Sequence, residues 1–192
     1  MANKDDQLLI SALIDSVKET MTKMFGASMS LTATVKKRSI VTWRGKMRIF
    51  VDEKFERDCY ISVVGLYTNE DNIKKDRPFG TVILYIARQR TLSLLTSLGI
   101  KFESKEAGQE GTPDEAIVSE GCGELCKTVV KGFQTKLTSL GYPDLILSSP
   151  RNYIRSVEDN ISFPSREESK VEVTFQIEGG DSIFIDFVIP VI

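Results

Sequence analysis

The spacing of apolar and polar residues changes along this chain, and each change marks a different kind of element. Residues 5–25 carry apolar side chains at helical spacing and end at Gly26, which predicts a first helix. Between residues 30 and 68 the apolar positions alternate instead, which predicts strands, and Arg44-Gly45 between two short runs indicates a hairpin turn. Residues 69–78 are polar and are predicted to form a loop.

The second half of the chain repeats this change from strand to helix and back. Residues 79–86 are almost continuously apolar, which is typical of a strand in the middle of a sheet. A short helix is expected over residues 88–98, and a strand over residues 145–147 that extends to residue 154. Residues 171–177 and 183–189 alternate strongly, so two strands joined by a hairpin at Gly179-Gly180 are predicted there.

Residues 112–142 form a long amphipathic segment that is predicted to be a helix. Thr112 as N-cap with Pro113 at the first position predicts its start, and Gly141 followed by Pro143 predicts its end. At about 100° per residue, the apolar side chains fall on one broad face of this helix and polar ones on the other. The exposed side is expected to carry a polar row of Glu120, Glu124, Lys127, Thr128 and Lys131.

These elements predict one α+β domain over residues 1–192, with a largely antiparallel sheet and its helices packed on one face. A length of 192 residues with 41% hydrophobic composition allows a substantial core. No segment has the length of a transmembrane helix, and residues 1–6 lack the pattern of a secretory signal, so we expect a cytoplasmic protein with no membrane partner. The net charge of −2 gives no overall preference for nucleic acid.

The cysteine and histidine content limits the chemistry. Cys59, Cys122 and Cys126 are too few for a disulfide framework, and the last two lie in the apolar arc of the long helix, so buried thiols rather than a metal site are expected. The chain contains no histidine, which excludes a histidine base and zinc sites that need imidazole. The groups that remain available for chemistry are the carboxylates, lysines and amides of this chain, or groups of a partner.

The order of elements, with a glutamate midway along a long helix and a proline at the strand that follows, resembles the CheC/CheX/FliY phosphatases of bacterial chemotaxis. The signature of that family is Asp or Ser, three residues, Glu, two residues, Asn, and, after twenty-two further residues, Pro. Glu124 and Pro150 match this signature, Glu120 is close to its acidic first position, and Lys127 replaces its asparagine. The resemblance extends over most of the chain and implies a CheX-like fold with one signature helix.

The resemblance implies that the long helix docks on a phosphorylated CheY-like response regulator and promotes hydrolysis of its aspartyl phosphate. The regulator would hold Mg²⁺ and a lysine that contacts the phosphate, so this chain would need no cofactor of its own. By the same resemblance, Glu124 pairs with that lysine, while the asparagine position orients the attacking water. A protonated Lys127 has three donors and no acceptor, so slow or absent hydrolysis is expected.

Three interpretations of the polar row stay open. In the first, the protein is an active phosphatase in which Glu124 docks and Lys127 or Gln134 supports the water. In the second, the same fold is a non-catalytic receiver-binding or scaffold module. In both, the remaining members of the row, Glu120, Thr128 and Lys131, contact the partner. In the third, the row is an ordinary solvated face in which Glu124 and Lys127 pair with each other.

Two further expectations concern other surfaces. Basic residues around Trp43 form a pattern that could bind a polyanion, although alternation on a hairpin would put only about half of them on one face, so a solvent-facing hairpin is preferred. These residues are Lys36, Lys37, Arg38, Arg44, Lys46 and Arg48. The resemblance also implies a homodimer through sheet edges, for which the long apolar strand over residues 183–189 is the candidate.

Overall fold

The computed structural model describes residues 4–25, 31–40, 42–43, 46–48, 59–97, 99, 114–155, 162–164, 169–177 and 182–190. Its helices are α1 (Lys4–Phe25), α2 (Glu70–Lys74), α3 (Arg88–Ser97) and α4 (Glu115–Ser139). Its strands are β1 (Leu31–Ser39), β2 (Thr42–Trp43), β3 (Lys46–Arg48), β4 (Cys59–Tyr67), β5 (Gly80–Ala87), β6 (Ile146–Leu147), β7 (Arg151–Arg155), β8 (Ser162–Pro164), β9 (Ser169–Ile177) and β10 (Ser182–Val188). The predicted α+β class is therefore confirmed.

The main sheet has seven strands in the order β1-β9-β10-β5-β4-β6, with β7 also paired to β4, and every pair is antiparallel. The predicted central strand is β5, which lies between β10 and β4. The last strand, β10, pairs with β9 on one side and β5 on the other, so the expectation that it forms a sheet edge is wrong. In the described part of the chain, the edges belong to β1 and to β6 and β7.

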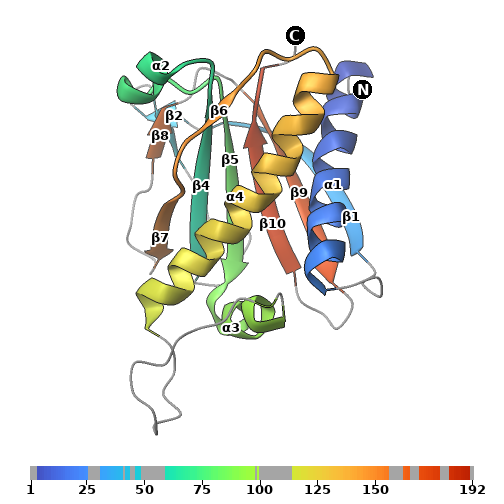
Figure 1. Cartoon of the computed structure of the whole chain (residues 1–192), viewed down its shortest axis with the longest axis vertical. Helices are drawn as coiled ribbons and strands as arrows, with labels where there is room; N and C mark the ends of the chain where they lie inside the picture. Colours follow the sequence, from blue (N-terminus) through green and yellow to red (C-terminus); the bar gives the residue numbers. More distant parts are fainter. Residues whose placement is uncertain are drawn as a thin grey trace, which may run out of the picture.

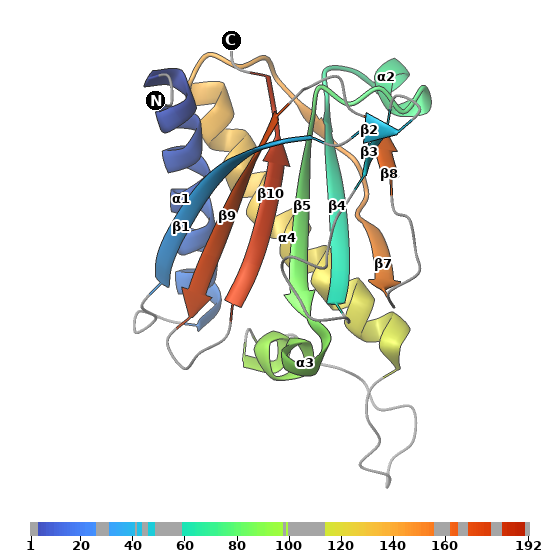
Figure 2. The ribbon, with the colours of Figure 1, turned by 180° about the vertical axis from the view of Figure 1, so that it is seen from behind.

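Helices α1 and α4 lie side by side on one face of this sheet (Figure 1), and the opposite face is seen from behind in Figure 2. The larger apolar core fills the space between the helices and the sheet, where the rings of Phe133 and Phe187 meet edge to face at 6.0 Å. A smaller cluster that includes Ile61 and Tyr85 covers the opposite face. Because both faces are covered, every residue of β4 is buried.

The beginning of α4 and the segment before β5 differ from the predictions. Helix α4 starts at Glu115, and Asp114 is its N-cap because its carboxylate accepts a hydrogen bond from the Ala116 N–H at 3.1 Å. The predicted loop over residues 69–78 contains the helix α2, because the Asn69 side chain caps it by accepting from the Asn72 N–H at 2.9 Å. The predicted caps Thr112-Pro113 lie outside the described residues.

Other predicted boundaries are confirmed. Gly141 has a φ of +89°, the left-handed conformation that ends α4. Strands β2 and β3 form the predicted short hairpin, and β9 and β10 form the predicted long one, with both turns outside the described residues. In the described ranges, no helix is long and apolar enough to cross a membrane.

Candidate functional site

The polar row predicted on the long helix lies on the outer face of α4, which runs diagonally across the sheet in Figure 1. All five of its side chains are exposed, and they are Glu120, Glu124, Lys127, Thr128 and Lys131. The opposite face of α4 is buried against the sheet and α1 through small and apolar residues. The sequence prediction of which residues α4 exposes is therefore confirmed, while the roles of these residues stay predictions.

The charged members of the polar row make no ion pair with any residue in the described ranges. Glu124 and Lys127 are separated by one turn, yet the intrahelical pair that the sequence allows is not formed. The Thr128 hydroxyl donates a hydrogen bond to the main-chain carbonyl of Glu124 at 2.8 Å. The carboxylates and ammonium groups of the row are consequently available to groups of a partner.

Gln134, which the sequence offered as an alternative support for water, is engaged in holding the fold together. Its side-chain Nε2 donates a hydrogen bond to the carbonyl of Leu145, just before β6. This contact fixes the chain after α4 against the end of the helix. The Gln134 amide nitrogen therefore has a structural task, and it lies two turns along the helix from Lys127.

Pro150, the matching proline, directly precedes β7, and β7 brings an amide to α4 that sequence reasoning missed. A Cβ built on Gly123 would lie 2.6 Å from Nδ2 and 2.8 Å from Oδ1 of Asn152, so the Asn152 side chain packs directly on the helix there. Asn152 pairs in register with Ser62 of β4, which lies beneath α4. The only available sequence signal was an asparagine two positions after the proline.

The three cysteines are buried thiols, as predicted, and none of them forms a disulfide. Burial raises the pKa of Cys126 to about 12 and raises that of Cys122 further in the same direction. The Cys126 thiol contacts the carbonyl of Ser62 at 3.5 Å. Such thiols stay protonated at neutral pH and are poor nucleophiles and metal ligands. The residues that the structure describes contain no group of acidic or cysteine side chains that could hold a metal ion.

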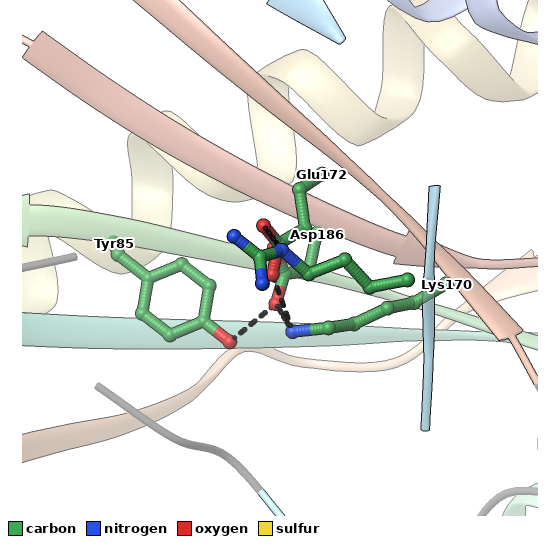
Figure 3. Close-up of polar contacts among 5 residues, drawn as sticks. Tyr85, Lys170, Glu172 and Asp186 are labelled. Atoms are coloured by element: carbon green, nitrogen blue, oxygen red, sulfur yellow. Dashed lines mark hydrogen bonds and ion pairs between the residues drawn. The ribbon is translucent and has the colours of Figure 1, made fainter. Parts of the chain in front are cut away.

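A second polar cluster lies on the face of the sheet opposite the helices (Figure 3), and no pattern in the sequence predicted it. Asp186 is 1% exposed and accepts hydrogen bonds from Tyr85 Oη at 2.9 Å and Lys170 Nζ at 2.8 Å. Lys170 also contacts Glu172 at 2.9 Å, and Glu172 contacts Arg38 at 2.8 Å. The two negative charges of the carboxylates balance the two positive charges of Lys170 and Arg38. The contacts of the cluster join β1, β5, β9 and β10.

The pKa shifts in this cluster follow its charges. Burial lowers the pKa of Lys170, but the attraction of Asp186 and Glu172 outweighs it and the net pKa is raised. Burial and the neighbouring Asp186 carboxylate raise the pKa of Tyr85 well above its ordinary value. Both groups therefore keep their protons at neutral pH. Since Arg38 pairs with Glu172, one cation of the predicted basic hairpin is already neutralised within the fold.

This geometry defines a class of protein in which one long helix crosses an antiparallel sheet, buries its apolar face and presents a row of charges to solvent. No family model and no curated protein sequence matches the chain. Solved structures do match it. FliY from Thermotoga maritima has a TM-score of 0.63 at 17% identity, covering 98% of this chain and 91% of that one.

Two further solved structures have similar scores. The CheX chain in the CheX–CheY–BeF3–Mg²⁺ complex from Borrelia burgdorferi has a TM-score of 0.56 at 14% identity, covering 94% of this chain and 96% of that one. The FliM middle domain from H. pylori has a TM-score of 0.61 at 10% identity, covering 100% of this chain and 94% of that one. The chain therefore has the fold of the CheC/CheX/FliY chemotaxis proteins, as the sequence resemblance implied.

Proposed function

We propose that the protein binds a phosphorylated CheY-like response regulator through the polar row of α4. The observation that carries this proposal is that the row is exposed along one helix face while its charges make no ion pair within the described chain. Unpaired charges in a fixed row give specificity and speed association when a partner presents the complementary charges. The shared fold with a CheX that was solved in complex with CheY, BeF3 and Mg²⁺ supports the choice of partner.

In this complex each charged group would have a distinct task. The Glu124 carboxylate would pair with the lysine that a receiver domain holds near its phosphate, because a carboxylate accepts from an ammonium group. The Lys127 ammonium would contact phosphoryl oxygens as a point charge. Mg²⁺ would be held by the regulator, and Glu120, Thr128 and Lys131 would contact its surface on either side of the site.

We further propose that docking promotes hydrolysis of the aspartyl phosphate. A water attacks phosphorus in line, the bond from phosphorus to the aspartyl oxygen breaks, and its electron pair stays on the released carboxylate. Both protons of the water finish on inorganic phosphate, so charge and atoms balance. The protein contributes position and charge to this step and forms no covalent bond itself.

The proposal is tested with the receiver domains encoded in the same genome as this chain. Each is activated with BeF3 and Mg²⁺, and its binding is measured by titration calorimetry, with and without activation. We expect at least one activated receiver to bind, and Glu124→Gln to weaken that binding by about 1 kcal/mol or more. The matched variant Glu70→Gln, on the exposed face of α2, serves as the control. Absence of binding to every activated receiver would refute the proposal.

A non-catalytic receiver-binding module is the second candidate function, and Lys127 is the observation that favours it. Lysine at this position has no hydrogen-bond acceptor for the attacking water. Measuring the decay of receiver phosphate with and without the protein separates the two candidates. Binding with an unchanged decay rate indicates the module, and accelerated decay indicates the phosphatase.

A further inference from the structure

Asn152 occupies an unusual position at the flank of α4. Its carboxamide packs on the helix backbone at Gly123, where any side chain would come within 2.8 Å of both amide atoms. The next residue on the same flank of the helix, one turn further on, is Lys127 of the polar row. Asn152 is half-buried, whereas Gly123 beneath it is buried.

The hydrogen bonding of this amide is incomplete. Asn152 Oδ1 is buried and has no hydrogen-bond partner in the described part of the chain, and the same holds for the hydroxyl of Ser62. The two residues are direct partners in the register of β4 and β7. A buried polar atom left without a partner costs about 1–3 kcal/mol, so an orientation of the amide that satisfies both residues is favoured.

A half turn of the amide about its Cβ–Cγ bond exchanges the positions of the oxygen and the nitrogen. The NH₂ group then lies beneath the helix on the side of the Ser62 hydroxyl, which can accept a hydrogen bond from it. The oxygen then takes the place of the nitrogen at Gly123, on the flank of α4 that carries Lys127 one turn further on. This orientation adds a neutral amide acceptor to the flank of α4.

We propose that Asn152 is the water-positioning residue of this surface. Its Oδ1 accepts a hydrogen bond from the water that attacks the phosphorus of a docked aspartyl phosphate, while Lys127 faces the phosphoryl oxygens. The inference rests on the proposed function, because it needs a docked receiver, and it assigns to one strand residue the acceptor that Lys127 lacks. Gly123 is then required because its missing side chain lets the amide reach the helix flank, and Pro150 sets the start of the strand that carries it.

The test follows the decay of receiver phosphate at saturating protein, together with binding of the BeF3-activated receiver. Asn152→Leu, of similar volume, should slow the accelerated decay by about tenfold or more and leave the dissociation constant within about twofold. Adding Lys127→Asn to Asn152→Leu should restore the acceleration, because the helix then supplies its own amide. A merely structural role of Asn152 would weaken the binding of the BeF3-activated receiver together with the decay rate, whereas loss of the acceptor slows the decay alone.

A second variant covers the case in which Asn152→Leu does not fold. Gly123→Ala improves helix propensity by about 1 kcal/mol and pushes the amide away, so it should cause the same loss of acceleration. Asn72→Leu, which removes an amide of α2, is the control and should leave the decay unchanged.

The failures of the two proposals are distinguishable. Unchanged acceleration in both Asn152→Leu and Gly123→Ala, or a wild-type protein that binds receivers without accelerating decay, overturns this inference and leaves the docking proposal intact. Absence of binding by the wild-type protein overturns both.

Discussion

The hydroxyl of Ser16 donates a hydrogen bond to the main-chain carbonyl of Val129 at 2.7 Å, which ties α1 to α4. The same hydroxyl lies 2.6 Å from the position that a Cβ on Gly132 would take. The two helices approach closely because glycine stands at this point of α4. The hydrogen bond and the glycine together set the position of the helix that carries the polar row.

Replacing Gly132 should show that the free energies of unfolding of variants at Ser16 and at position 132 are coupled. Gly132→Ala places a methyl group against the Ser16 hydroxyl and should destabilise the protein by about 1–3 kcal/mol, because the helices must move apart or the hydrogen bond must break. In a Ser16→Ala background the same change should cost less, giving a coupling of about 0.5–3 kcal/mol. Urea denaturation of the two single variants and the double variant measures this, and additive values would contradict the packing described.

Among the residues of the charged cluster behind the sheet, Lys170 should contribute most to folding stability. Lys170→Met leaves the buried Asp186 without a cation and should cost about 3–5 kcal/mol. Tyr85→Phe removes one neutral donor from Asp186 and should cost about 1 kcal/mol. The control Lys36→Met changes an exposed lysine of β1 and should stay within about 0.5 kcal/mol. Thermal or urea denaturation should reproduce this ranking.

The buried thiols predict a loss of stability in alkali. The pKa of Cys126 is raised by burial from 9.0 to about 12, so the folded protein keeps a proton that the unfolded chain releases near pH 9. The free energy of unfolding should be constant below pH 9 from this cause and fall above it by up to about 1.4 kcal/mol per pH unit for each such thiol. Urea denaturation between pH 8 and pH 10 checks the slope. A Cys122→Ala/Cys126→Ala variant should show a shallower slope of unfolding free energy against pH. An equal slope would contradict the assignment of this pH dependence to the buried thiols.

An asparagine in place of Lys127 should raise any hydrolytic rate. Lys127→Asn supplies an acceptor for water on α4 itself, so the decay of receiver phosphate should become faster, and Glu124→Ala should remove that gain by weakening the docked complex. The control Lys136→Asn makes the same change on α4 outside the polar row, where the lysine pairs with Glu19 at 2.7 Å. If Lys127→Asn changes neither the decay nor the binding, α4 is not the docking surface.

Local sequence patterns were enough to predict most of the elements of this fold. Helical spacing predicted α1 and α4, and Gly141 predicted the end of α4, because these signals act between residues close in sequence. The exposed position of Glu124 and Lys127 followed from the same periodicity. The short helix α2 was missed because its cap, Asn69, is equally typical of a loop.

Only the tertiary structure decided how these elements meet. It placed β10 inside the sheet rather than at an edge, because strand order depends on pairings between distant segments. It gathered Tyr85, Lys170 and Asp186 into one buried cluster from three strands. It also laid Asn152 against Gly123, a contact that no periodicity encodes, since it exists only where β7 passes beneath α4. The sequence by itself determined which face of α4 is polar, and tertiary packing determined which distant side chains lie against the rest of the helix.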